Sequence, residues 1–227
     1  MNKPKDCPKI SIIICTLNEE GNLPYVLPKI PQWIDEVLLV DGNSTDHTVK
    51  IAQELYPNIK VLLQPDTGKG NAMRYGIQEA TGEIVVMLDA DGSTDPSEIS
   101  NFIEPLLKGY HFVKGSRFLN IKPVMPPLRR FGNRFFATLT NILYGTNYTD
   151  VCAGLNVFWK RILPQLDPMG TSFLDEPTLN IRLKKKGLKV KEIPQHDTGR
   201  IMGKANESFL PQGWRILRII ISERFRG

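Results

Sequence analysis

Two carboxylates, Asp89 and Asp91, stand one residue apart directly after the run 83–88, which is apolar from its second residue onward. A short apolar run of this kind is typical of a strand buried on both faces. Carboxylates at the end of such a strand can share a hard divalent cation, which prefers oxygen ligands and keeps positions open for phosphate oxygens. The alternative is a solvated turn, because Asp-Gly and Thr-Asp-Pro are common turn sequences.

Polar clusters follow two earlier predicted strands in the same way. The run 10–15 is followed by a cluster that begins at Thr16, and the run 36–40 is followed by Asp41. Strands that alternate with helices of about ten residues form a mostly parallel sheet through right-handed crossovers. Ligands of such sheets bind beyond the carboxyl ends of the strands. The convergence of three polar clusters therefore favours a binding site over a turn at Asp89 and Asp91.

Asp41 and Lys69 indicate what such a site can bind. Asp41 can accept charge-assisted hydrogen bonds from a nucleobase N–H, or it can cap the next helix together with Ser44 or Thr45. Lys69 stands between two glycines, as in a turn that holds a phosphate. The spacing is not that of a P-loop, so a plain turn is the alternative there.

The alternation of strand and helix signals predicts an α/β fold, with a mostly parallel sheet flanked by helices in a single domain. Strands are expected at 10–15, 36–40, 59–63, 83–88 and 188–193. Helices are expected as a weak segment ending near residue 29 and at 48–55, 71–80, 128–144, 177–186 and 214–225. The segment 123–127 is rich in proline and is predicted to be a loop.

Two of the predicted helices carry apolar stripes. The stripe residues are Phe131, Phe135, Leu139 and Ile142 in the first helix, and Trp214, Leu217, Ile221 and Phe225 in the last. A stripe of this kind usually packs against the body of a domain. A terminal amphipathic helix can instead lie in a membrane interface, and the sequence leaves both possibilities open for the last helix.

The composition is that of a globular protein, with 227 residues of which 41% are hydrophobic and a formal net charge of +5. This charge suits phosphorylated ligands or an anionic membrane surface. Nucleic acid is not an expected partner, because basic residues interleaved with aromatic ones do not form a stripe. The three cysteines lack metal-ligand spacing, which favours a reducing compartment. No apolar stretch reaches about 18 residues, so we expect a cytoplasmic protein, at most peripheral to the membrane.

Taken together, the motifs resemble the nucleotide-sugar half of inverting family 2 glycosyltransferases with the GT-A fold. The motifs that carry this resemblance are Thr16-Leu17-Asn18-Glu19-Glu20, Val40-Asp41-Gly42-Asn43-Ser44-Thr45-Asp46, Gly68-Lys69-Gly70-Asn71-Ala72 and Leu88-Asp89-Ala90-Asp91. A narrower likeness to the dolichol-phosphate mannosyltransferase branch rests on Gly115-Ser116-Arg117-Phe118, Leu128-Arg129-Arg130-Phe131-Gly132-Asn133 and Thr149-Asp150-Val151-Cys152-Ala153-Gly154. The resemblance extends from about residue 10 to residue 200.

The resemblance implies how the chain is divided and which residues bind the nucleotide sugar. Residues from about 8 to 115 would form the nucleotide-sugar-binding half, about 116–205 the acceptor-side half, and 209–227 a C-terminal amphipathic helix. The implied nucleotide-sugar-binding residues are Thr16, Asn18, Glu19, Asp41, Lys69, Asp89, Ala90 and Asp91. Asp89 and Asp91 would hold Mg2+ or Mn2+.

The resemblance also implies an acceptor site. Arg117 and one of Arg129 or Arg130 would face an acceptor phosphate, which arginine can grip with two hydrogen bonds. Surface arginines on a solvated helix are the alternative for Arg129 and Arg130. Lys204, in a loop that follows the last predicted strand, is a further candidate for phosphate contact.

Asp175 and Glu176 precede a predicted helix, at a place where transferases acting on hydroxyl groups carry a general base. A carboxylate there can take the acceptor proton. An acceptor that is already a phosphate anion needs no such base. The alternative is that both carboxylates simply favour the helix dipole.

These observations predict inverting transfer of a hexose from a nucleotide-sugar donor of the GDP-mannose or UDP-glucose type. The leading acceptor is a polyprenyl phosphate, dolichyl or undecaprenyl. Gly42 stands where the mannosyltransferase branch often has a second aspartate, which leaves the donor open. One alternative is transfer to a sugar hydroxyl, as on a glycan, or to a soluble acceptor, with Asp175 or Glu176 as base. Another is a non-catalytic nucleotide-sugar-binding module.

Overall fold

The computed structural model describes residues 3–119, 123–167, 175–203 and 209–225. Its centre is a 7-stranded sheet with the strand order β3-β2-β1-β4-β6-β5-β7. The strands are β1 (Ile10–Thr16), β2 (Glu36–Asp41), β3 (Lys60–Leu63), β4 (Ile84–Asp89), β5 (Phe112–Ser116), β6 (Asn156–Trp159) and β7 (Val190–Pro194). β6 runs antiparallel to both of its neighbours, whereas all other pairs are parallel. The predicted mostly parallel α/β sheet is confirmed.

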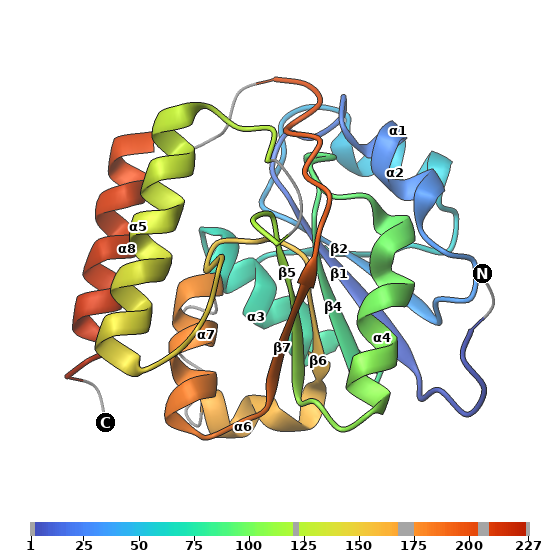
Figure 1. The fold of residues 1–227 in the computed structure, drawn as a ribbon. Coiled ribbons are helices and arrows are strands. Elements are labelled where there is room, and N and C mark those ends of the chain that lie inside the picture. The colour runs from blue at the N-terminus through green and yellow to red at the C-terminus, as the bar shows by residue number, and fades with distance from the viewer. Residues whose placement is uncertain (1–2, 120–122, 168–174, 204–208, 226–227) are drawn as a thin grey trace.

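Helices cover both faces of this sheet (Figure 1). They are α1 (Leu23–Val26), α2 (Thr48–Leu55), α3 (Lys69–Glu79), α4 (Ile99–Leu107), α5 (Pro127–Tyr144), α6 (Leu163–Leu166), α7 (Glu176–Lys185) and α8 (Phe209–Ser222). Short 3-10 turns lie at Leu27–Lys29, Pro96–Glu98 and Lys160–Ile162. Successive residues of β1 enter different cores: Ile12 and Ile14 pack with α4, and Ile13 packs with α3 and α7. β1 is therefore buried on both faces, as its β-branched sequence predicts.

The strands β5 and β6 were not predicted from the sequence, because neither carries a usable pattern. β5 contains Lys114, a charged residue that is fully buried in the structure. β6 is only four residues long, and its antiparallel course breaks the expected strand-helix alternation.

The helices α5 and α8 lie side by side as an outer pair packed on α7 (Figure 1). They share a third core cluster, in which Phe136 and Ala137 of α5 meet Ile216 and Ile220 of α8. Tyr144 strengthens the pairing by donating a 2.6 Å hydrogen bond from its hydroxyl group to the backbone oxygen of Ile220. The pair therefore belongs to the same folded body as the sheet.

The apolar stripes of these two helices do not pack inward, although inward packing is the usual arrangement for such a stripe. In α5, Phe131 is 71% exposed and Ile142 is 75% exposed, while the buried face includes Asn133 and Phe136. In α8 the stripe is likewise exposed at Trp214, Ile221 and the following Phe225, whereas the residues Ile216 and Ile220 are buried. Leu139 and Leu217 alone among the stripe residues pack partly against the core. Helical periodicity shows that a helix has an apolar side, but it does not show which side meets the protein.

None of the helices within the described ranges combines the length and apolar composition that a membrane crossing requires.

Candidate functional site

The ends of β1, β2 and β4 meet at one edge of the sheet, as the sequence predicts. β1 lies between β2 and β4 in parallel register, with Thr16 paired to Asp41 and Cys15 paired to Asp89. The backbone N–H of Gly42 donates to the backbone oxygen of Thr16 at 2.8 Å. The polar clusters that follow β1, β2 and β4 therefore lie next to one another.

Asp41 organises the cluster at the ends of β1 and β2. Its carboxylate is buried and accepts hydrogen bonds from the hydroxyl group and the backbone N–H of Ser44, at 2.6 and 2.8 Å. It also accepts from the Thr16 hydroxyl group at 3.1 Å. Asn18 is exposed, has a φ of 56° and accepts a hydrogen bond from the backbone of Thr45. Asp41 thus fixes the loop that presents Asn18.

Asp89 and Asp91 lie at the end of β4 among cations. The Lys69 ammonium is 2.7 Å from Asp89 Oδ1 and 2.6 Å from Glu176 Oε1. Arg200 lies 2.7 Å from Glu19 Oε2 and 3.9 Å from Asp91 Oδ2. Each carboxylate of the predicted pair therefore has a basic neighbour, while both side chains remain 27% exposed.

The charge on Asp89 is stabilised by these neighbours. Burial opposes its ionisation, but the ammonium of Lys69 outweighs the burial and lowers the pKa of the Asp89 carboxyl group. Burial likewise opposes the charge on Lys69, yet Asp89 and Glu176 hold the pKa of its ammonium group well above the ordinary value. Asp89 is therefore an anion at neutral pH, which is the form that binds a metal.

Asp89 and Asp91 suit a metal ion that binds together with a phosphorylated ligand. Among the described residues, no group of three or more His, Cys, Asp or Glu side chains is placed to hold a metal ion. Asp89 and Asp91 offer partly exposed carboxylate oxygens, and a hard cation needs about six oxygen ligands. Phosphate oxygens and water would have to supply the others. Ala90 contributes no side chain, because its methyl group is buried in the core.

Asp89, Asp91 and Lys69 line a cavity that extends to the first turns of α5 and α8. The same cavity is lined by Asp175 and Glu176, and by the arginines Arg117, Arg129, Arg200 and Arg215. Arg130 is half-buried on α5 and is absent from the described residues that line it. Lys204 lies outside the described residues. Thr16, Asn18 and Asp41 stand at the neighbouring strand ends, outside the lining of this cavity.

The two carboxylates at the start of α7 are both engaged. Asp175 caps the helix by accepting from the backbone N–H of Thr178, and it lies 3.4 Å from Arg215. Burial raises the pKa of Asp175, although the bonds from Thr178 and the charge of Arg215 oppose this. Glu176 is held by Lys69. Asp175 therefore has a structural role at the start of α7, which is one of the two alternatives left open by the sequence, and both residues lie beside the predicted metal site.

Arg117 is held in place by a buried carboxylate. Its Nε and Nη2 atoms donate to the two oxygens of Asp150 at 2.7 and 3.1 Å, and Nη2 also donates to the backbone oxygen of Cys152 at 3.0 Å. Asp150 is fully buried, and burial opposes its charge, but Arg117 outweighs the burial and lowers the pKa of Asp150. Planar, two-point pairing of this kind fixes the orientation of a guanidinium group.

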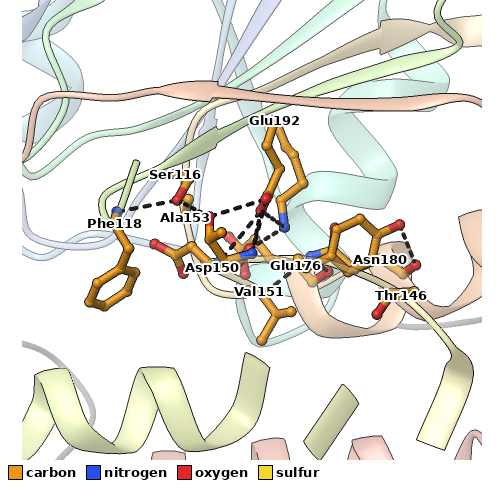
Figure 2. A network of polar contacts seen from close by, with 12 residues as sticks. Ser116, Phe118, Thr146, Asp150, Val151, Ala153, Glu176, Asn180 and Glu192 are labelled. Carbon is orange, nitrogen blue, oxygen red and sulfur yellow. Dashed lines mark hydrogen bonds and ion pairs between the residues drawn. The ribbon is translucent and has the colours of Figure 1, made fainter. Parts of the chain in front are cut away.

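Next to this pair lies a network of polar contacts that has no signature in the sequence (Figure 2). The Glu192 carboxylate accepts hydrogen bonds from the backbone N–H groups of Thr149 and Asp150. The buried Lys114 ammonium lies 3.5 Å from Glu192 and donates to the backbone oxygen of Asp150. In the sequence, the segment 149–154 stands out only as a motif, and no signal there pairs it with Lys114 or Glu192. The network holds this segment against the site.

Gly154 is where this segment touches the predicted metal site. A Cβ atom at this position would stand 1.8 Å from Oδ2 of Asp89, far inside any real contact distance. We expect Gly154→Ala to displace the Asp89 carboxylate and to weaken Mn2+ binding in the presence of nucleoside diphosphate by about tenfold or more. Titration calorimetry measures this affinity. Circular dichroism and the unfolding temperature serve as the control for folding, and unchanged Mn2+ affinity in a folded variant would contradict the placement of Asp89.

Comparison with known proteins gives a family match over most of the chain. A family model described as glycosyl transferase family 2 matches residues 11–166. Glycosyltransferase AglJ of Haloferax volcanii is 29% identical over 191 residues, which cover 82% of this chain and 61% of that protein. Low-salt glycan biosynthesis hexosyltransferase Agl6 of the same organism is 28% identical, over 94% of this chain and 53% of that protein. The chain therefore spans little more than half the length of these two relatives.

A third relative matches over most of both chains. The dolichyl-phosphate hexose transferase of Haloferax volcanii is 29% identical over 188 residues, which cover 82% of this chain and 81% of that protein. Among solved structures, glucosyl-3-phosphoglycerate synthase from Mycobacterium tuberculosis in complex with phosphoglyceric acid has a TM-score of 0.78 at 18% identity, covering 96% of this chain and 80% of that chain. The same enzyme has been crystallised with Mn2+ and uridine diphosphate. This structural likeness confirms the predicted GT-A fold.

Proposed function

The chain belongs to glycosyl transferase family 2, and from this premise we propose that it transfers a hexose, with inversion, from a nucleoside-diphosphate sugar to a polyprenyl phosphate. The observation that carries the proposal is the lining of one cavity by the carboxylates Asp89 and Asp91 together with Arg117 and Arg129. A metal-bound diphosphate suits the carboxylates, and a second phosphate suits the arginines. The name of the dolichyl-phosphate hexose transferase among the relatives agrees with this acceptor.

On the donor side, the nucleoside would lie along the ends of β1 and β2, where Asp41 orders the loop that presents Asn18. The diphosphate would extend toward Asp89, Asp91 and Lys69. A divalent metal bound there would offset the charge that develops on the leaving diphosphate. Lys69, which lies between the carboxylates of Asp89 and Glu176, would add its positive charge to that of the metal beside the diphosphate.

On the acceptor side, an oxygen of the polyprenyl phosphate would attack the anomeric carbon as the bond to the nucleoside diphosphate breaks. The phosphate is ionised at neutral pH, so no base has to remove a proton from it. Its position matters more than its activation, because holding two reactants in line removes much of the entropic barrier. Arg117 suits this task because Asp150 fixes the plane of its guanidinium group.

The second candidate is transfer to a hydroxyl group with Asp175 or Glu176 as general base. It is favoured by the position of both carboxylates in the lining of the same cavity. Against it stand their existing bonds: Asp175 caps α7, and Glu176 pairs with Lys69 at 2.6 Å. A base must be within hydrogen-bond reach of the proton that it takes, and both carboxylates are already bonded to other partners.

The Glu176→Gln variant separates the two candidates. We expect transfer to a polyprenyl phosphate to fall by less than about tenfold, because the amide still accepts from Lys69 and no proton has to be removed. If Glu176 were the base, kcat would fall by about a hundredfold or more, and the acidic limb of its pH profile would disappear. Initial rates across a range of pH measure both. A thermal shift with UDP or GDP and Mn2+ identifies the nucleoside and reports on donor binding in the same variant.

A further inference from the structure

The outer side of the α5–α8 pair exposes large apolar side chains. The set, here called the outer face, comprises Leu128, Phe131, Phe135 and Ile142 from α5, and Leu210, Trp214, Ile221 and Phe225 from α8 and the residue stretch that follows it. Each of these side chains is at least 47% exposed. Single exposed apolar residues are ordinary, but a group of them gathered on two adjacent helices indicates an interaction surface.

The geometry of the two helices places these residues on one side of the molecule. In each helix they recur at intervals of three, four or seven residues, which line up along one helix face. The opposite faces carry Phe136, Ala137, Ile216 and Ile220, which all enter the core cluster that also contains Ile181 of α7. Because both helices bury their inner sides in this one cluster, both outer sides point away from the body of the protein (Figure 1).

The charged residues of the same two helices indicate which kind of partner the outer face binds. Neither α5 nor α8 contains an aspartate or glutamate within its bounds. Both contain arginines, namely Arg129, Arg130 and Arg134 in α5, and Arg215 and Arg218 in α8. An apolar stripe with aromatic residues, flanked by arginine and free of acidic residues, is the composition of a helix that lies in an anionic membrane interface. A second copy of the chain would set arginines against arginines, which is unfavourable.

The outer face also adjoins the cavity of the site. The first turn of α5 contributes Arg129 to the cavity lining, and the first turns of α8 contribute Gln212 and Gly213. Val124, just before α5, both lines the cavity and is 62% exposed. A bilayer that covers the outer face would therefore bring its headgroups to the level of the cavity mouth.

We propose that the outer face of α5 and α8 docks on an anionic lipid bilayer and holds the cavity mouth at the headgroup layer. The docking itself follows from exposure and charge alone. Its use, delivery of a lipid-linked acceptor phosphate to Arg117 and Arg129, rests on the proposed function. Arginines at the rim would contact lipid phosphates, while Phe131 and Trp214 would enter the boundary between headgroups and acyl chains.

Vesicle binding by the whole chain tests the docking. We expect sedimentation with vesicles that contain phosphatidylglycerol and phosphatidylcholine, weaker binding to phosphatidylcholine alone, and a decrease with added salt. Brominated lipids in the same vesicles should quench the fluorescence of Trp214, which is 64% exposed in the structure. The Trp214→Phe variant should still bind but should lose this quenching, since Trp33 and Trp159 are half-buried elsewhere in the domain.

The double variant Phe131→Ser/Trp214→Ser removes the two aromatic anchors without touching the core. We expect its partition coefficient to fall about tenfold or more, because each buried aromatic side chain contributes substantially to transfer from water. Leu63→Ser is the matched control: Leu63 is 63% exposed on β3, away from the helix pair, and its loss should leave vesicle binding unchanged. A donor-induced thermal shift equal to that of the wild type verifies that the double variant is folded.

The outcomes separate this proposal from the proposed function. Absence of vesicle binding, or equal loss in the Leu63→Ser control, would overturn the docking surface. Concentration-dependent dimerisation that the double variant abolishes, without vesicle binding, would overturn it in favour of a second copy of the chain. In either case, transfer to a short, water-soluble prenyl phosphate would leave the proposed function standing. Vesicle binding without any transfer would support docking and contradict the function.

Discussion

Replacement of Asp91 by asparagine is expected to lower kcat/KM for sugar transfer by about a hundredfold or more. The amide can still accept the 3.0 Å hydrogen bond from the backbone of Ser93, so the loop after β4 keeps its shape. What disappears is one of the two carboxylates proposed to hold the metal, and with it the negative charge that a divalent cation requires. Metal stabilisation of a leaving diphosphate contributes several kcal/mol, which corresponds to this loss in rate. Initial rates with Mn2+ and a donor sugar give the measurement.

Asp95→Asn is the matched control for this variant. Asp95 lies in the same loop and also accepts from a backbone N–H two residues on, that of Ser97, but it is absent from the described lining of the cavity. Its replacement should change kcat/KM by less than about twofold, since this partly exposed carboxylate lies outside the described lining of the cavity. Full activity of Asp91→Asn at limiting Mn2+ would contradict the assignment of a metal site.

Replacement of Arg117 by methionine is expected to destabilise the fold by about 3–5 kcal/mol, because it leaves the fully buried Asp150 without its bidentate partner. For a domain of this size, such a loss lowers the unfolding temperature by roughly 10 °C. Calorimetry or circular dichroism measures it. Lys108→Met, which breaks the exposed pair with Glu104, is the control and should cost at most about 1 kcal/mol.

The pH dependence of this effect has a defined sign. The pKa of Asp150 is lowered in the folded protein, so its pairing contributes stability that is present at neutral pH and is lost as the pH falls through the folded-state pKa. In Arg117→Met, the charge of Lys114 and the hydrogen bond from the backbone of Cys152 still oppose burial, but the guanidinium charge is lost, so the pKa of Asp150 is higher than in the wild type. The stability difference between the two proteins should therefore be largest at neutral pH and should narrow below about pH 4. A constant difference from pH 3 to pH 7 would contradict the role of this ion pair.

The grouping of Asp89, Asp91 and Lys69 at the strand ends was predictable from the sequence because it depends on local patterns. β1, β2 and β4 are short β-branched runs that each end in a polar residue, and parallel packing brings such ends together. Asp89, Asp91 and Lys69 accordingly lie where the strand-helix pattern places them. The same rule did not extend to β6, whose antiparallel insertion between β4 and β5 has no signature in its four residues.

The surroundings of Arg117 and the outward direction of the α5–α8 stripes were less predictable, for two physical reasons. Lys114, Asp150 and Glu192 are charged residues in the interior, and no periodicity shows which buried charges will pair across distant segments. The apolar stripes of α5 and α8 identify both helices as amphipathic, yet Phe131 and Trp214 face outward. Amphipathicity is a property of one helix, whereas the direction of its apolar side depends on what the helix meets.

The most direct test of the proposed function is the fate of a labelled hexose. The purified protein would be incubated with Mn2+, a polyprenyl phosphate in vesicles, and labelled UDP-glucose or GDP-mannose. We expect label in the organic phase as a polyprenyl-phosphate hexose, with the anomeric configuration opposite to that of the donor by NMR, and no product with Asp91→Asn. Label transferred only to a free sugar or a soluble acceptor, or a product with retained configuration, would contradict the account.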